Sequence, residues 1–403
     1  MKNNIILSLL FVAFLNIHCS VNNYYKINKT VEQSQVFPSN FKQEIRFDIS
    51  QNNVILKVKI QGKDYNFILN SYSNFCALDT ELAATLQLKN QFKIPNNDDE
   101  NEAYSFAELE KISIGNLNFS KVICAIDDLN CSSCNNCAHI DGIIGTNLMA
   151  KAIWQINYPN NKIIITSHQD SLPLNKNKKT INFHTDYGYL MGKPIVALSV
   201  NYNYICDAVV GTSGCNKIRL HSSLVKRISN STQTYQGYYL KNAALGNQRD
   251  TFKNYLVPSL TIGDDLNLTN LIIWSYKYER SSIGYDFLKN YSVTLDWKKQ
   301  QILLYKMKEE NFDTYGYYIN YADNKVIVCT LFQNSPAEKA GLKLNDHIIK
   351  INDQDLSNPT QQDFCQLKDP YLNDKIQLTV KRGNEILEMT IPKIDERTLF
   401  NKL

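Results

Sequence analysis

Residues 145–158 read GTNLMAKAIWQINY, and residues 284–297 read GYDFLKNYSVTLDW. The two stretches align without a gap, and each then runs through a polar turn into an apolar strand, at residues 163–165 in one copy and 302–304 in the other. Self-similarity of this kind indicates that one structural unit occurs twice. The chain therefore contains two related halves.

A short loop precedes the repeated stretch in each copy. Residues 67–73 read FILNSYS, and residues 209–214 read VVGTSG. The alternating residues 54–60 and 194–200 predict a strand in each copy, followed by a polar turn and a second strand that ends at the loop. The order of the parts is the same in both halves.

Two such copies resemble the bilobal, pepsin-like aspartic peptidases, whose lobes each look like a retropepsin subunit, and particularly the exported bacterial proteins of that type. The resemblance covers roughly residues 41–307. It implies a mainly β fold with two retropepsin-like β-barrel lobes. The family carries Asp-Thr-Gly-Ser in each loop, so Asn70 and Gly211 occupy its two acid positions.

The chemistry of the family depends on those acids, because two neighbouring carboxylates share one proton and activate a water molecule. Neither Asn70 nor Gly211 can ionise as a carboxylic acid. The resemblance therefore implies a degenerate catalytic dyad and no intact catalytic residue. The alternative is an active aspartyl protease that uses non-standard acid residues.

The loop residues next to the acid positions are partly retained. Ser71 and Thr212 keep a hydroxyl where the family has threonine, so a hydrogen bond between the two loops is expected. Tyr72 and Ser213 replace the family's glycine. A side chain at Tyr72 is expected to reshape the loop, because glycine permits closer backbone approach.

A third unit follows the two copies. Residues 335–342 read SPAEKAGL, and residues 346–352 read DHIIKIN. This pattern resembles a PDZ domain of the kind appended to bacterial envelope proteases, a small α/β fold. Ser335 and Pro336 suit the N-cap and first position of a short helix.

The PDZ resemblance implies a groove that reads chain termini. It assigns one loop to the peptide's terminal carboxylate, the next strand to β-augmentation and a helix after Pro359 to the opposite wall. The alternative is a domain that packs on the second lobe and binds no peptide. The expected peptide-binding residues are Tyr315, Gly316, Tyr317, Tyr318, Ile319, Gln361 and Phe364.

The length of 403 residues suits several domains. The expected order is 1–19 signal peptide, 20–40 tether, 41–168 first aspartic-peptidase-like lobe, 169–192 interlobe connection, 193–307 second lobe and 308–396 PDZ domain.

The N-terminus indicates export. Lys2 precedes an apolar run at residues 5–15 that is too short to span a bilayer. Cys19 follows closely, and a lipid-modified cysteine at this place is typical of bacterial lipoproteins. We expect a lipid anchor at Cys19, with simple cleavage as the alternative, and a location in the cell envelope, at the periplasm or outer membrane. Residues 21–40 are expected to have little structure.

Cys131, Cys134 and Cys137 lie close together, with His139 just beyond. This spacing suits a Cys₃His zinc site or a disulfide-stapled loop, with Cys124 as a candidate partner. Disulfides are favoured, because such close thiols oxidise in an exported protein unless metal arrives first. No metal and no cofactor are expected.

The net charge of +4 is small, and the cluster around Lys176 suits a polar connection better than a nucleic-acid surface. The sequence thus indicates an exported pseudoprotease with a PDZ module. It would bind extended peptides, protein C-termini or a partner protease. A structural cell-envelope lipoprotein is the third alternative.

Overall fold

The computed structural model describes residues 27–400 except 87, 96–102, 131–136, 174–176, 187–191, 215–216, 229–231, 242–247, 276–279 and 368–372. The fold is mainly β, as the sequence predicts. Two compact units divide the chain. The first takes in residues up to 196, 209–215 and 284–307, and the second takes in 197–208, 216–283 and 308–403. None of the helices in these described stretches is both long and apolar enough to cross a bilayer.

The first sheet follows the strand order β1-β9-β6-β10-β5-β4-β8-β7, with β3 beside β4. Its core strands β5 and β10 run parallel, so that Leu69 pairs with Ile144. Helix α2 follows β6 directly. The bounds are β1 Gln35–Phe37, β3 Asp48–Ser50, β4 Asn53–Ile60, β5 Lys63–Leu69, β6 Cys76–Asp79, α2 Thr80–Thr85, β7 Lys89–Pro95, β8 Ala103–Ile114, β9 Leu117–Asp127 and β10 Gly142–Ile144.

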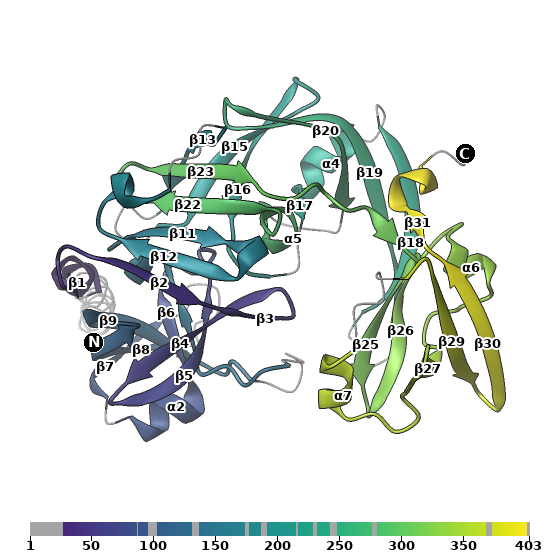
Figure 1. Cartoon of the computed structure of the whole chain (residues 1–403), viewed down its shortest axis with the longest axis horizontal. Coiled ribbons are helices and arrows are strands. Elements are labelled where there is room, and N and C mark those ends of the chain that lie inside the picture. Colours follow the sequence, from purple (N-terminus) through teal and green to yellow (C-terminus); the bar gives the residue numbers. More distant parts are fainter. Residues whose placement is uncertain are drawn as a thin grey trace, which may run out of the picture. The chain divides into compact units, whose positions relative to one another are not determined.

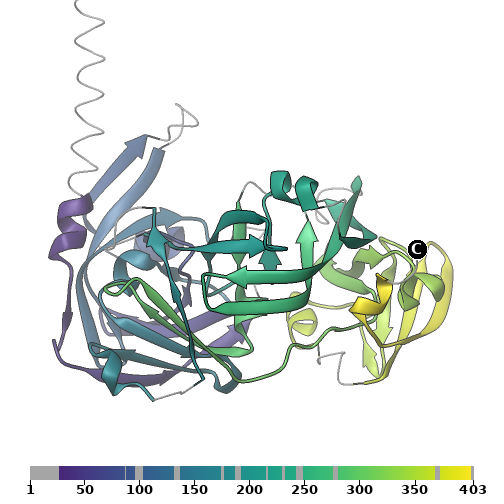
Figure 2. The same ribbon diagram turned by 90° about the horizontal axis from the view of Figure 1, so that it is seen from above.

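A helix of residues 27–33 packs beside the β7–β8 hairpin (Figure 2). Ile27 and Val31 are each 2% exposed and share a cluster with Phe106 of the hairpin. The carbonyl of Val31 accepts a hydrogen bond of 2.5 Å from Lys151 Nζ. The expectation of little structure in residues 21–40 is therefore wrong for residues 27–37, because two apolar side chains four positions apart give this polar segment a buried stripe.

The second sheet has six strands in the order β13-β23-β22-β11-β12-β2. At its centre β11 and β22, which come from the two repeated stretches, pair with each other (Figure 1). A short helix precedes each of them. The bounds are β2 Lys42–Arg46, α3 Thr146–Met149, β11 Ile153–Asn157, η1 Tyr158–Asn160, β12 Lys162–Thr166, η2 Gln169–Ser171, β13 Lys179–Asn182, α5 Tyr285–Leu288, β22 Tyr291–Asp296 and β23 Gln301–Lys306.

The third sheet continues from the second copy into the C-terminal domain, in the order β14-β15-β16-β21-β17-β20-β19-β18-β26-β27-β29-β30. The bounds in the second copy are β14 His184–Thr185, β15 Pro194–Val200, β16 Tyr204–Val210, β17 Ile218–Arg219, α4 Ser222–Ile228, β18 Gln233–Lys241, β19 Gln248–Ile262, β20 Leu266–Ser275 and β21 Ser281–Ile283. Those of the C-terminal domain are β24 Asp313–Thr314, β25 Tyr317–Ala322, β26 Lys325–Phe332, α6 Pro336–Lys339, β27 His347–Ile351, β28 Gln354–Asp355, α7 Gln361–Cys365, β29 Lys375–Arg382, β30 Glu385–Pro392, β31 Ile394–Asp395 and η4 Glu396–Leu399.

The C-terminal domain is joined to the second copy by strand pairing. Gly237 of β18 pairs with Phe332 of β26, and Tyr238 pairs with Leu331. A Cβ atom on Gly237 would lie 2.2 Å from Phe252 Cζ and 2.8 Å from the Leu331 carbonyl oxygen, so this close approach needs glycine. The domain therefore packs on the β18–β19 hairpin, while the other edge of β26 is occupied by β25.

A buried carboxyl group fastens the C-terminal turn η4 to the same hairpin. Glu396 is 4% exposed and accepts hydrogen bonds from the Tyr235 hydroxyl and, at 3.5 Å, from Asn254 Nδ2. Burial raises the pKa of Glu396, and Lys217 and the two hydrogen bonds offset part of that rise. The protonated form of Glu396 is therefore more favoured in the folded protein than in the unfolded chain.

We expect Glu396→Gln to stabilise the protein at about pH 8 and to change little at about pH 4. A raised folded-state pKa gives stability that is complete below the unfolded pKa and is lost as pH rises through the folded pKa. Glutamine keeps an acceptor oxygen but carries no charge, so the gain at about pH 8 should be about 1–2 kcal/mol. Thermal unfolding at both pH values measures it, with exposed Glu388→Gln as the control. A destabilised variant at about pH 8 would show instead that the attraction to Lys217 outweighs burial.

Candidate functional site

Two loops with the expected motif residues come together in the first unit. One loop follows β5 and begins at Asn70, whose amide donates to the Ile144 carbonyl at 3.0 Å. The other follows β16 and begins at Gly211. The parallel pairing of β5 with β10 aims the first loop, because Leu69 is held opposite Ile144.

Reciprocal hydrogen bonds join the loops. The Ser71 amide donates to Thr212 Oγ1 at 3.0 Å, and the Thr212 amide donates to Ser71 Oγ at 3.1 Å. Each hydroxyl then donates to a backbone carbonyl, Ser71 to Val210 at 2.6 Å and Thr212 to Leu69 at 2.8 Å. Both side chains are fully buried. The hydroxyl protons are thus committed to the scaffold, and neither group is placed as a nucleophile.

Two further residues support this junction. Ser213 Oγ donates to the Leu69 carbonyl at 2.8 Å and accepts from the Val54 amide at 3.0 Å. The Tyr158 hydroxyl donates to the Thr212 carbonyl at 2.9 Å. Burial raises the pKa of Tyr158 well above its usual range, which keeps its hydroxyl a donor. Ser213 therefore adds to the loop junction by hydrogen bonding.

The acid positions hold no ionisable group. Asn70 Oδ1 accepts the Tyr72 amide at 2.9 Å, which turns the loop back on itself. Tyr72 is 38% exposed, and Lys193 Nζ lies 5.0 Å from the centre of its ring. A Cβ on Gly211 would lie 3.6 Å from Tyr72 Cβ, which is ordinary contact. The Tyr72 side chain therefore lies beside the position of the second acid.

The nearest acids along the first copy have structural roles. Asp79 Oδ1 accepts from the Glu81 amide at 2.9 Å and caps α2. Asp141 Oδ2 accepts from the Asn66 amide at 2.7 Å. Asp79 therefore caps a helix, and Asp141 fastens the backbone of β5. Asp207 is exposed on β16, four residues before Gly211.

Glycine at the start of α3 permits a close crossing of two segments. A Cβ on Gly145 would lie 2.1 Å from the Phe75 carbonyl oxygen. The Gly145 amide lies 3.4 Å from Cys76 Sγ and donates to it. No side chain fits at this point, which accounts for glycine after Ile144.

The C-terminal domain presents the second set of expected residues. Gly316 has a φ of +90°, and a Cβ there would lie 2.1 Å from Ser335 Cβ. Its amide, expected to face a ligand carboxylate, donates to Thr314 Oγ1 at 3.0 Å. A ligand carboxylate would therefore have to compete with this hydroxyl for the Gly316 amide.

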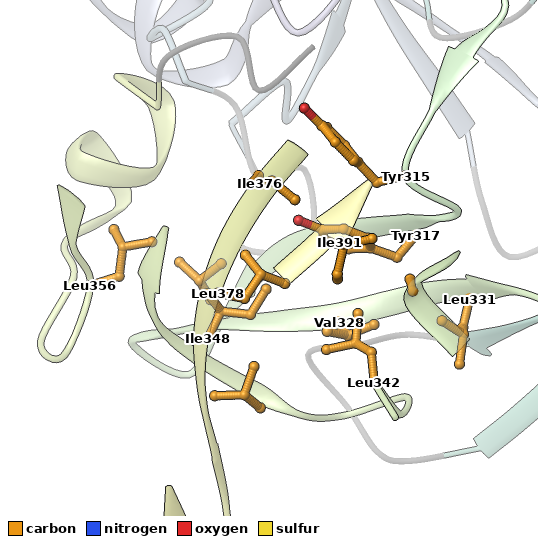
Figure 3. Packing of buried hydrophobic residues seen from close by; sticks show 13 residues of the cluster. Tyr315, Tyr317, Val328, Leu331, Leu342, Ile348, Leu356, Ile376, Leu378 and Ile391 are labelled. Atoms are coloured by element: carbon orange, nitrogen blue, oxygen red, sulfur yellow. The ribbon is translucent and has the colours of Figure 1, made fainter. Parts of the chain in front are cut away.

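The tyrosines of this loop point in different directions. Tyr315 and Tyr317 are 1% and 6% exposed and belong to the domain core (Figure 3). The Tyr315 hydroxyl donates to the Asn373 carbonyl at 2.7 Å. Tyr318 packs on Trp274, with ring centres 5.6 Å apart. These rings form core and interface surfaces, whereas we expected them to line an open pocket.

The remaining expected residues lie on β25 and α7. Among the described strands, β25 pairs with β26 alone, so no described strand covers its other edge. Ile319 and Phe364 are half-buried against the domain core, and Phe364 lies 6.1 Å from the Tyr321 ring between centres. Gln361 is exposed on α7. The helix begins with a capping box formed by Thr360 and Asp363.

Of the three cysteines predicted to form disulfides, Cys137 is described, and it is disulfide-bonded. Cys365 also takes part in a disulfide bond. Cys124 is a free, buried thiol, so its expected tie to the cysteine-rich loop is wrong. Within the described ranges no three histidine, cysteine or acidic side chains gather as metal ligands. Cys131, Cys134 and the predicted lipidation site Cys19 lie outside the described residues.

Comparison with known families agrees with this geometry. Residues 56–148, which include the first loop, match the aspartyl protease family. Residues 284–392 match the PDZ domain family. The chain carries an aspartyl protease-like domain and a PDZ domain. The PDZ match begins at Gly284, before the C-terminal domain itself.

One curated relative shares a short segment. The carboxy-terminal processing protease CtpB of Bacillus subtilis (strain 168) is 43% identical over 49 residues, which is 12% of this chain. The chain spans only 10% of the length of that relative.

Sequence reasoning missed two residues that shape these sites. Tyr158, which binds the Thr212 carbonyl, ends the repeated stretch, and the repeat alignment marks it by placing it opposite Trp297. Thr314, which accepts from the Gly316 amide, carries no signal beyond its place before the PDZ loop.

Proposed function

We propose that the protein is an exported pseudoprotease that binds peptides through their C-termini without cutting them. One observation carries the proposal: the two loops of the aspartyl protease-like domain are fully hydrogen-bonded to each other, yet Asn70 and Gly211 supply no carboxylate. Without that pair, the general acid–base step of the family has no proton carrier.

The PDZ domain supports the binding half of the proposal. The edge of β25 away from β26 borders no described strand and would accept an extended peptide as an additional strand, with α7 as the opposite wall. A relative named as a carboxy-terminal processing protease makes chain termini the favoured ligand class. A partner protease that receives the bound terminus is part of the same proposal.

Export and a lipid anchor complete the proposal. They rest on the apolar run at residues 5–15 and on Cys19, as read in the sequence. The disulfide bonds of Cys137 and Cys365 support an oxidising compartment.

Capture from a peptide library tests the binding proposal. The mature protein is incubated at neutral pH with peptides that vary at their last residues, and the retained peptides are sequenced. We expect retained peptides to share a preference at the last residue and to be recovered whole. Retention that ignores the terminus, or no retention at all, would favour the structural-lipoprotein alternative.

A further inference from the structure

The centre of one face of the six-stranded sheet is polar. Gln155 of β11 pairs with Thr294 of β22, and Asn157 pairs with Ser292. Figure 1 shows the two strands side by side. Alternate residues of a strand share a face, so these four side chains lie together while Trp154 lies on the other face. Thr294, Ser292 and Gln155 are only 2%, 6% and 9% exposed.

These groups leave hydrogen-bonding capacity unused. Gln155 Nε2 donates to Thr294 Oγ1 at 3.2 Å. Asn157 Oδ1 is buried without a partner in the described part of the chain. Ser292 Oγ bonds to no described residue but is not among the fully buried atoms. A buried polar group left unpaired costs about 1–3 kcal/mol, and most such groups in proteins have a partner. A ligand or ordered water is therefore expected at this face.

Two adjoining pockets open on these groups. One has a volume of about 260 Å³ and is lined by Ser292, Thr294 and Tyr305. The other has a volume of about 510 Å³ and includes Asn157. They share Gln155 as a lining residue. Together they fall within the size range of small-molecule sites.

The amide and hydroxyl groups of the lining favour a polyhydroxylated ligand. Amides and hydroxyls both donate and accept, as sugar hydroxyls do. Tyr305 and Leu303, which pair with Ser292 and Thr294, add apolar surface for the C–H face of a sugar ring. The two pockets are also lined by charged residues of both signs, which are Arg46, Lys162, Lys178, Lys299, Glu44 and Asp170. Lys162 is paired with Glu44 at 2.7 Å.

We propose that this pair of pockets on the polar face of the six-stranded sheet is a saccharide-binding site. It is separate from the degenerate loops and from the PDZ groove, and it does not depend on the proposed function. The cross-strand pairs supply the hydrogen bonds, and Tyr305 supplies the stacking surface.

Ligand titration of the mature full chain tests the site. The probes are N,N′-diacetylchitobiose, maltose and glucuronate. Saturation-transfer NMR and calorimetry measure the binding of each. We expect at least one neutral disaccharide to bind. Ser292→Ala and Thr294→Val should each weaken that binding at least fivefold, while exposed Thr390→Val leaves it unchanged.

The melting temperature distinguishes a variant that loses sugar binding from one that loses its fold. Because Ser292 Oγ has no described partner, Ser292→Ala should leave the melting temperature unchanged or raise it. If it lowers the melting temperature, Asn157→Ala provides the second variant and must weaken sugar binding. Absence of disaccharide binding would overturn the site in favour of ordered water, and binding of glucuronate alone would overturn it in favour of an anion site.

Discussion

The purified protein should show no pepstatin-sensitive peptide hydrolysis at any acidic pH. Asn70 and Gly211 leave the loops without an acid, while Asp79 caps α2 and Asp141 bonds to the backbone of β5. General acid–base catalysis contributes about 10²–10⁴-fold to a rate, and its loss alone should remove detectable cleavage. Peptide cleavage followed by mass spectrometry, with and without pepstatin, measures this.

Restoring both acids should recover little activity. A Cβ at position 211 has room, since its nearest neighbours would lie 3.6 Å away, but the new carboxylate would sit beside Tyr72. We expect the double variant Asn70→Asp with Gly211→Asp to cleave peptides slowly. Adding Tyr72→Gly should raise its cleavage rate at least about tenfold, which corresponds to about 1.4 kcal/mol in the activation free energy. Asn70→Asp alone serves as the matched control. Strong cleavage by the double variant would show that only the acids had been lost.

Amidation of a bound peptide's C-terminus should weaken binding by about tenfold or more, each tenfold step being about 1.4 kcal/mol. The PDZ resemblance assigns backbone amides near Gly316 to donate to the terminal carboxylate, which would have to displace Thr314 Oγ1 from the Gly316 amide. Charged acceptors make the stronger hydrogen bonds. Calorimetry with paired free-acid and amidated peptides measures the difference. The full mature chain should be used, because Phe332 and Tyr318 of the PDZ domain pack on the second copy.

Two variants test whether the peptide binds in the PDZ groove. Phe364→Ala removes a half-buried wall of the groove and should weaken the free-acid peptide, whereas exposed Ile386→Ala on β30 should not. Equal affinity for free-acid and amidated peptides would exclude recognition of the terminus. The domain would then act only by packing on the β18–β19 hairpin.

Much of the fold follows from local patterns. The repeated stretches predict the paired central strands β11 and β22, and the SPAEKAGL pattern predicts α6 with its Ser335 cap. Gly145 and Gly316 lie where backbone geometry leaves no room for a side chain. The motifs mark these glycines, although the atoms that crowd them belong to Phe75 and Ser335, in other segments of the chain.

The remaining features depend on contacts between distant segments. The pairing of Gly237 with Phe332 leaves no mark in the periodicity of either strand. The buried helix of residues 27–33 lies in a polar segment whose composition indicates a linker. The Thr314 hydrogen bond to the Gly316 amide is set by the turn, so the motif alone could not show that this amide already has an acceptor.

Native mass spectrometry of the mature protein with a library-selected peptide tests the central claim most directly. The account predicts a complex whose mass equals the protein plus the intact free-acid peptide, unchanged after long incubation at acidic and neutral pH, and much less of it with the amidated peptide. Accumulation of shortened peptide that pepstatin prevents would contradict the account.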